Sequence, residues 1–141
     1  MAVAVKRVYE GASPADGVRV LVDRLWPRGL RKEDAAVKFW LRDVAPSTEL
    51  RQWFHANPEA WGLFRKRYLK ELASPAGSAA VDKLHDLAEG KPTLTLLYAS
   101  RNQERNNATV LKELLEGMKK PPSSVGRAAI GRGRIRKAKK Q

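Results

Sequence analysis

Residues 18–29 read VRVLVDRLWPRG, in which a β-branched apolar run passes directly into a polar, basic and aromatic segment. The near-continuous apolar part, Val18–Asp23, is typical of a parallel strand that is covered on both faces. In an open α/β sheet, ligands bind just beyond the carboxyl ends of the strands. The stretch therefore predicts a parallel sheet and places a candidate site in the residues that follow this strand.

The composition excludes several classes of protein. The length of 141 residues fits one domain with enough buried surface for a core. The absence of cysteine excludes disulfides, thiolate metal sites and a cysteine nucleophile. No stretch reaches the roughly 20 apolar residues of a membrane span, and the first residues lack the pattern of a secretory signal. We therefore expect a cytoplasmic protein that does not associate with membranes.

The net charge of +13 is unevenly distributed along the chain. Nine of the 28 lysines and arginines, and none of the 15 aspartates and glutamates, lie in residues 118–141. This segment has too little apolar surface to fold alone. We expect an α/β domain in residues 1–117, followed by a flexible, disordered basic tail in residues 118–141.

Apolar periodicity predicts the order of the elements. Strand patterns occupy residues 3–9, 18–23, 37–41 and 93–98, although the third is short enough to fit a helix as well. Helical patterns occupy residues 48–55 with Ser47 as N-cap, a segment that begins at Pro58 after Asn57, residues 79–89 before Gly90, and a segment that ends near Glu116. This order predicts a single compact α/β domain with a mainly parallel sheet of about four strands flanked by helices.

Four side chains that follow the strand at 18–23 form the first candidate site: Asp23, Arg24, Trp26 and Arg28. Pro27 restricts the backbone and Gly29 permits a sharp turn, so the guanidinium and indole groups have a set arrangement. Arginine binds carboxylates and phosphates in bidentate geometry. Asp23 is the candidate for acid–base catalysis. The alternative is structural: Asp23 and Arg24 pair with neighbours, and Trp26 fills the core.

Six side chains at the end of the strand at 93–98 and beyond it form the second candidate site: Tyr98, Ser100, Arg101, Asn102, Asn106 and Asn107. Here a strand passes into a helix, and the free N–H groups at a helix start attract anions. Arg101 adds a full positive charge. The alternative for each asparagine is helix capping, which stabilises a helix by about 1 kcal/mol.

The two candidate sites meet if their strands are neighbours in one sheet, because both loops then open at the same edge. Arg24, Arg28 and Arg101 are then expected to clamp a small phosphate- or carboxylate-bearing molecule. Trp26 and Tyr98 wall the cleft, and Asn106 or Asn107 orients the ligand. If the site is catalytic, hydrolysis or group transfer through Asp23 fits it best. A third interpretation is a partner-binding module, in which the arginines point apart and are neutralised by local acids.

Other catalytic and metal-binding patterns are missing from the sequence. His55 and His85 have no partner at metal-ligand spacing, and no serine lies in a Gly-x-Ser-x-Gly setting. Walker and dinucleotide-binding motifs are also absent. We therefore expect neither a metal nor a cofactor.

The basic tail carries the alternative function. Four cations lie close together in it: Arg132, Arg134, Arg136 and Lys137. A flexible polycation binds DNA or RNA by counterion release, without sequence preference. The opposing interpretation is a solvated extension that only raises solubility.

The stretches quoted so far resemble the YeaO-like branch of the domain-of-unknown-function family numbered 488. The resemblance runs from about Lys6 to Leu111 and is most specific in residues 19–29. Further matching stretches are Arg7–Tyr9, Ala45–Ser47 with Leu50–Arg51, Phe64 with Tyr68 and Glu71–Leu72, and Leu94–Tyr98 with Asn106 and Ala108.

The resemblance implies a compact α/β domain without a settled activity. It also implies that position 107 often holds histidine in similar proteins, where this chain has Asn107. If that histidine acts as a general acid or base, this chain lacks it, because asparagine does not titrate near neutral pH. The substitution favours ligand binding over catalysis.

Overall fold

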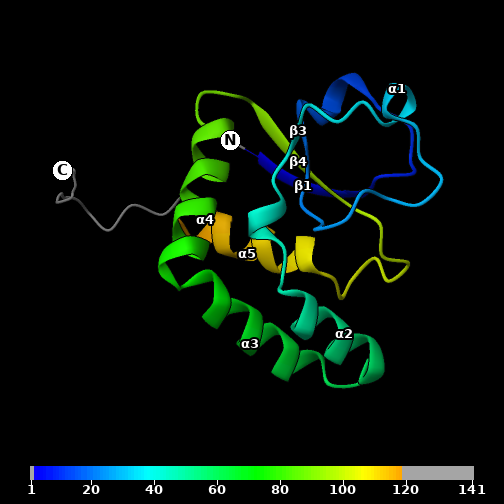
Figure 1. Cartoon of the computed structure of the whole chain (residues 1–141). Coiled ribbons are helices and arrows are strands. Elements are labelled where there is room, and N and C mark those ends of the chain that lie inside the picture. The colour runs from blue at the N-terminus through cyan, green and yellow to red at the C-terminus, as the bar shows by residue number, and fades with distance from the viewer. Residues whose placement is uncertain (1, 119–141) are drawn as a thin grey trace, which may run out of the picture.

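A four-stranded parallel sheet forms the centre of the computed structural model, which describes residues 2–118 (Figure 1). The strands are β1 (Ala2–Arg7), β2 (Val18–Leu21), β3 (Phe39–Trp40) and β4 (Thr93–Tyr98). Their order across the sheet is β1-β4-β2-β3, and every pairing is parallel. The predicted α/β class with a mainly parallel sheet is therefore confirmed.

Strand β4 lies at the centre because its buried apolar sequence pairs on both sides. It pairs with β1 from Thr93 to Tyr98, and with β2 in the register Val18–Leu94. The β2 ladder continues beyond the strand, where the Val22 N–H donates to the Leu97 carbonyl at 3.1 Å. The carboxyl ends of β2 and β4 therefore lie side by side.

Four helices lie on one side of the sheet and share an apolar core with it (Figure 1). They are α2 (Thr48–Ala56), α3 (Trp61–Leu72), α4 (Pro75–Ala88) and α5 (Asn107–Met118). The segment between β2 and β3, which contains the short helix α1 (Lys32–Ala35), lies on the other side. Two 3-10 turns complete the structure, η1 (Pro14–Asp16) and η2 (Arg42–Val44).

The sheet separates two apolar cores, because successive strand residues point to opposite faces. The larger core joins Val20, Leu94 and Leu96 of the sheet to the inward faces of the four helices. The smaller core packs Leu21 and Leu97 against the half-buried Trp26 and against residues of the segment between β2 and β3. Both faces of β2 and β4 are thus buried, as the apolar run at 18–23 predicts.

The helix boundaries follow the capping residues, and one expectation is wrong. Ser47 caps α2 as predicted, with its Oγ accepting from the Leu50 N–H at 3.1 Å. Asn57 does not start a helix: its side chain donates to the Trp53 carbonyl at 2.9 Å at the end of α2, so α3 begins only at Trp61. Helix α4 starts earlier than predicted, because Ser74 caps it.

Two expectations concern parts of the chain outside these elements. None of the helices within residues 2–118 has both the length and the apolar character needed to cross a bilayer. The proposed tail and its cluster Arg132, Arg134, Arg136 and Lys137 lie outside the described residues.

A buried ion cluster joins β1, η1 and the start of β2. The Asp16 carboxylate accepts from the Arg19 guanidinium at 2.6 Å and from the Lys6 ammonium at 3.1 Å. Arg19 also donates to the carbonyls of Ala35 and Ala36, which anchors the end of α1. Burial alone would raise the pKa of Asp16, but the Ser13 N–H and the two cations outweigh it and lower that pKa.

We expect Asp16→Asn to lower the free energy of unfolding by about 3 kcal/mol, because the variant leaves the Arg19 charge buried without its counter-ion. A carboxyl whose pKa is lowered on folding stabilises the protein at pH values above its ordinary pKa of 3.8. This stabilisation is lost as the pH falls below that value toward the lowered pKa of the folded protein. Urea titrations from pH 7 to pH 3 should show this loss in the native chain and a flatter profile in the variant.

Asp34→Asn is the matched control, because its carboxylate is exposed and lies 3.9 Å from Arg31. A loss of stability in Asp34→Asn equal to that in Asp16→Asn would contradict the role of the buried cluster.

Candidate functional site

A pocket of about 680 Å³ opens at the carboxyl ends of β2 and β4. Its walls come from the loop after β2, the loop between β4 and α5, helix α2 and the first residue of α5. Most of the predicted site residues line it: Asp23, Arg24, Trp26, Arg28, Ser100, Asn106 and Asn107. Parallel pairing of β2 with β4 brings the two candidate loops to this edge.

A second depression, of about 450 Å³, lies at the start of β2. The side chain of Arg19 borders it, but its guanidinium is already bonded to Asp16 and to two backbone carbonyls. The pocket at the carboxyl edge is the better candidate, because most of its cations are not used in this way.

Asp23 sits between the two strand ends and holds them together. Its Oδ2 accepts from the Ala99 N–H at 2.9 Å, and its backbone carbonyl accepts from the Trp40 indole at 2.8 Å. Burial raises the pKa of the Asp23 carboxyl, whereas the hydrogen bonds from Ala99 and Asn107 and the charge of Arg51 act in the opposite direction. This half-buried acid therefore takes up a proton more readily than an ordinary aspartate.

The two asparagines have structural roles of different kinds. Asn106 is buried and caps α5: its Oδ1 accepts from the Thr109 N–H at 3.0 Å, and its Nδ2 donates to the Asn102 carbonyl at 2.8 Å. Asn107 donates from Nδ2 to the Val22 carbonyl at 2.8 Å and also hydrogen-bonds the Asp23 carboxyl. Asn107 therefore ties the start of α5 to the end of β2.

Arg24 lines the pocket, but most of its guanidinium is bonded to backbone. Nε donates to the Pro46 carbonyl at 3.2 Å and Nη2 donates to the Ala45 carbonyl at 3.1 Å. These bonds hold the segment that leads into α2. The side chain expected to clamp a ligand thus positions the pocket wall.

The loop after β2 has a fixed shape. Gly29 has a φ of 75°, which provides the sharp turn predicted at this position. The Trp26 indole N–H donates to the Leu30 carbonyl at 2.7 Å, and the Tyr9 hydroxyl donates to the Arg28 carbonyl at 2.9 Å. The backbone of Arg28 is therefore held at the pocket, while its exposed side chain is left to reach a ligand.

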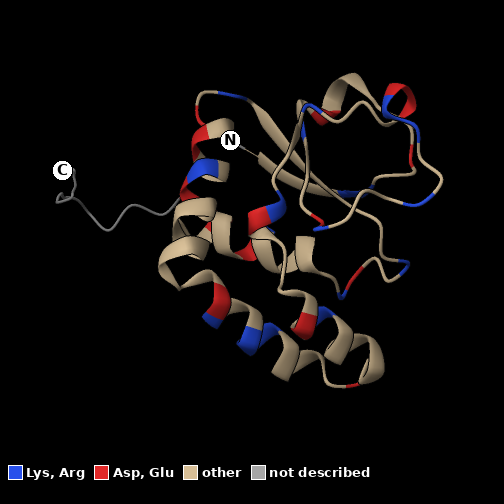
Figure 2. Cartoon of the chain, in the orientation of Figure 1, with Lys and Arg blue, Asp and Glu red and all other residues tan. Residues whose placement is uncertain are grey.

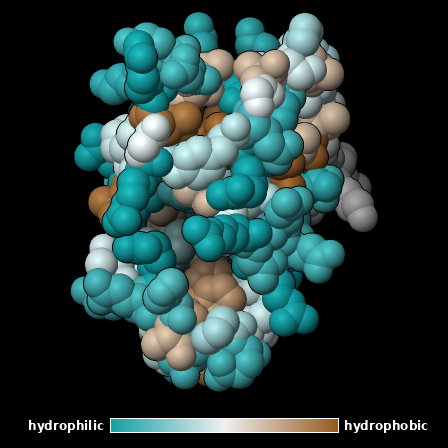
Figure 3. All heavy atoms as spheres, turned by 90° about the vertical axis from the view of Figure 1, so that its right-hand side faces the viewer, coloured by the Kyte–Doolittle hydropathy of each residue, from teal (hydrophilic) through white to brown (hydrophobic). Residues whose placement is uncertain are grey.

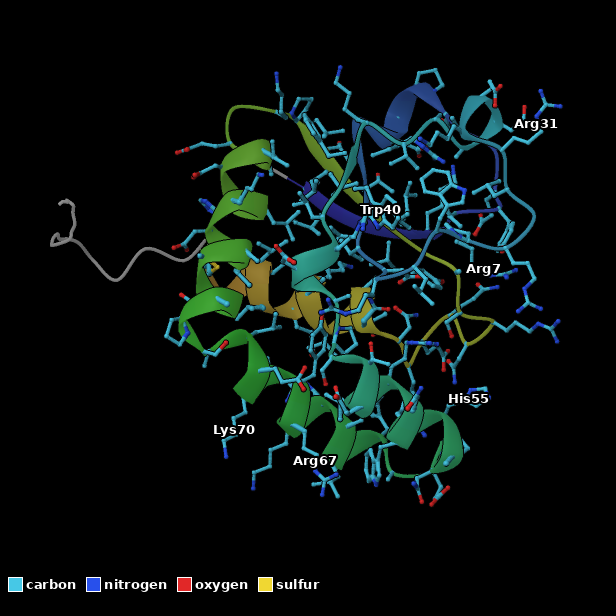
Figure 4. All side chains as sticks on the ribbon, viewed as in Figure 1. Arg7, Arg31, Trp40, His55, Arg67 and Lys70 are labelled. Carbon is cyan, nitrogen blue, oxygen red and sulfur yellow. The ribbon has the colours of Figure 1, made fainter. Side chains whose placement is uncertain are left out.

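Helix α2 supplies pocket residues that the sequence analysis missed. Arg51, Phe54 and His55 all line the pocket, and their spacing places them on one face of the helix. His55 projects from α2 toward the loop between β4 and α5 (Figure 4). The helical spacing of these residues was visible in the sequence, but no local signal showed which loops this face meets.

The loop after β4 turns differently from the expectation. Asn102 Oδ1 accepts from the N–H groups of Glu104 and Arg105 at 3.0 and 2.8 Å, so the chain folds back on itself. This turn brings Arg105 to the pocket, whereas Arg101 is exposed and is not among the lining residues. Tyr98 does not wall the pocket either: it belongs to the larger core and is not among the lining residues.

The pocket is strongly basic. Arginines 24, 28, 51 and 105 line it with His55, against the single carboxylate of Asp23. Among residues 2–118, the guanidiniums of Arg28, Arg51 and Arg105 have no hydrogen bond or salt bridge to another side chain or to backbone. Basic segments mark both loops at this edge in Figure 2.

Comparison with known proteins finds one matching family model and several uncharacterised relatives. Residues 2–125 match a family described as the inactive DUF488-N3 subclade. Uncharacterised proteins of Mycobacterium tuberculosis and Mycobacterium bovis are each 48% identical over 115 residues, which is 82% of this chain and 94% of theirs. No solved structure matches the chain.

The uncharacterised protein YeaO of Escherichia coli is 44% identical over 118 residues, which covers 84% of this chain and all of YeaO. The family match over residues 2–125 includes both loops that border the pocket. The chain therefore belongs to the DUF488 family, in its YeaO-like branch.

Proposed function

We propose that the pocket binds a small anionic molecule that carries a phosphate or a carboxylate, and that binding rather than catalysis is its function. The observation that carries this proposal is the charge of the lining: four arginines face one carboxylate. A concentration of one sign of charge in a cleft attracts ligands of the opposite sign. Guanidinium groups also match the oxygen geometry of phosphates and carboxylates.

The three arginines without partners support the proposal most directly. Guanidiniums that serve only structure are paired with acids or carbonyls, as Arg19 and Arg24 are in this chain. Arg28, Arg51 and Arg105 come from three separate elements and line one hollow without such pairing inside residues 2–118. This arrangement argues against the interpretation as a partner-binding module whose arginines are neutralised locally.

The size and shape of the pocket fit a small ligand. Sites for small molecules commonly enclose about 300–1,000 Å³ and combine apolar walls with a few polar groups. The pocket volume of about 680 Å³ lies within that range. Ser100 and Asn102 add neutral hydrogen-bonding groups at the rim of the loop after β4.

Several features favour binding over catalysis. The matching subclade is described as inactive. The family resemblance implies that similar proteins often carry histidine at position 107, where this chain has asparagine. The Asn107 side chain is bonded to the Val22 carbonyl and the Asp23 carboxyl. Hydrolysis or group transfer with Asp23 as acid–base group is the alternative for this same pocket.

We expect Arg51→Gln and Arg105→Gln to weaken the binding of inorganic phosphate about tenfold or more each, because a charge-assisted hydrogen bond contributes about 1.5–3 kcal/mol. Isothermal titration calorimetry with phosphate on the full chain measures the effect. Lys70→Gln is the control, because Lys70 projects from α3 away from the sheet (Figure 4). Equal phosphate binding by all four proteins would contradict the proposal.

We expect anion binding to strengthen as the pH falls toward the raised pKa of Asp23, because protonation removes the one negative charge of the pocket lining. Sulfate is the suitable probe, since its charge does not change between pH 5 and pH 8. The measurement is made in His55→Gln, so that the second titratable group of the lining does not contribute. A further Asp23→Asn substitution should flatten the profile; an unchanged slope would count against this role of the carboxyl.

A second candidate function rests on residues 118–141, which hold nine cations and no acid. Such a segment binds nucleic acid through phosphate contacts, with an affinity that falls steeply as salt rises. In this alternative the tail supplies affinity for DNA or RNA and the folded domain positions it.

Removal of residues 121–141 separates the two functions. We expect the shortened chain to lose salt-sensitive retention of DNA or RNA, because it loses most of the clustered positive charge. Its phosphate titration should stay unchanged, since the pocket lies within residues 2–118. Nucleic-acid binding that survives the deletion would contradict a role for the tail.

A further inference from the structure

The pocket has an aromatic wall beside its basic groups. Phe54, Phe64 and Trp26 line it together with Pro46 and Pro58. Figure 3 shows this side of the molecule, where apolar atoms lie in a recess bordered by hydrophilic side chains. A site for a bare inorganic anion does not need such a wall, because phosphate and sulfate present only oxygen atoms to the protein.

Phe54 lies next to one of the positively charged side chains of the pocket. Phe54 follows Arg51 by three residues in α2, so the two side chains share one face of the helix. The Phe54 ring is half-buried and stacks on Phe64, with centroids 4.3 Å apart and planes inclined by 20°. Phe64 in turn stacks on Trp61 at 5.7 Å. The wall is therefore already rigid without a ligand.

Trp26 contributes apolar surface and not a hydrogen bond. Its indole N–H is bonded to the Leu30 carbonyl, and its ring meets Trp40 edge-on at a centroid distance of 5.4 Å. The indole is thus fixed and its donor is occupied. Trp26 lines the pocket from the smaller core, on the side of the sheet opposite to Phe54.

We propose that the ligand of this pocket carries an aromatic or heteroaromatic ring next to its phosphate or carboxylate. The inference rests on the anion-binding function proposed above and adds the chemical class of the ligand. The ring packs against Phe54, which is backed by the buried Phe64, while the anionic group meets Arg28, Arg51 and Arg105. Rigid aromatic walls favour planar groups, because stacking then costs no reorganisation of the protein.

Two probes with the same charge and different bodies test the inference: phenyl phosphate and methyl phosphate. Calorimetry on the full native chain should show phenyl phosphate binding about fivefold or more tighter, the range expected for one stacked ring. Phe54→Leu keeps an apolar side chain and should remove most of this preference. Phe54→Tyr keeps the ring and should retain it.

Methyl phosphate separates a failure of this inference from a failure of the proposed function. The readout in Phe54→Leu is the ratio of its two affinities, and measurable binding of methyl phosphate shows that the variant has folded. Equal binding of both probes to the native chain, abolished for both in Arg51→Gln, would overturn the aromatic class and leave the anion site standing. Failure of both probes to bind, or binding that does not depend on Arg51, would overturn both proposals.

Discussion

Parallel pairing between β2 and β4 is the constraint on which the rest of the structure depends. The ladder runs from the pair Val18–Leu94 to the bond between the Val22 N–H and the Leu97 carbonyl. Asp23 then extends the same connection with a side chain, since its carboxylate accepts from the Ala99 N–H. Because both strands end at one edge, their loops share one space, and that space is the pocket. An antiparallel pairing would have placed the two loops at opposite ends of the sheet.

Six arginines of residues 2–118 fall into two groups with different physical roles. Arg7, Arg19 and Arg24 donate to backbone carbonyls and thereby fix loops: Arg7 holds the carbonyls of Ala99 and Ser100 behind the pocket. A guanidinium is well suited to this task, because it carries several donors in one plane. The arginines at positions 28, 51 and 105 have no such use among the described residues, and they line the pocket together with Arg24. The first group positions the elements that carry the second.

Aromatic packing connects the pocket to the larger core. Phe54, Phe64 and Tyr68 form a continuous series of ring contacts between α2 and α3, and the Tyr68 hydroxyl donates to the Val44 carbonyl below the sheet. Helix α2, which carries Arg51 and His55, is therefore held against α3 by these rings. Two of them, Phe54 and Phe64, also line the pocket. The side chains that stabilise the packing of α2 on α3 are thus also those proposed to contact the ligand.

Local patterns in the sequence were sufficient for the strands, for the α/β class and for the edge at which to look for a site. In the sequence, apolar β-branched runs alternate with segments of helical periodicity, and each candidate loop directly follows a strand. The strands, the α/β class and the position of the loops therefore depend on residues that are near neighbours along the chain. The same holds for Ser47 as the cap of α2 and for the turn at Gly29. The prediction that Asn57 starts a helix was wrong, because asparagine is used as a cap at both the start and the end of helices.

The membership of the pocket depends on contacts between residues far apart in the sequence. Arg51 and Phe54 belong to α2, whose helical periodicity is evident in the sequence. That this face of α2 meets the loops is decided only by how the helix packs in the core. Arg105 rather than Arg101 lines the pocket because the chain turns at Asn102. Arg24 donates to the carbonyls of Ala45 and Pro46 because the segment that leads into α2 passes beside it. Hydrophobic periodicity reports which side of an element is buried; it carries no information on which distant charge comes to lie beside it.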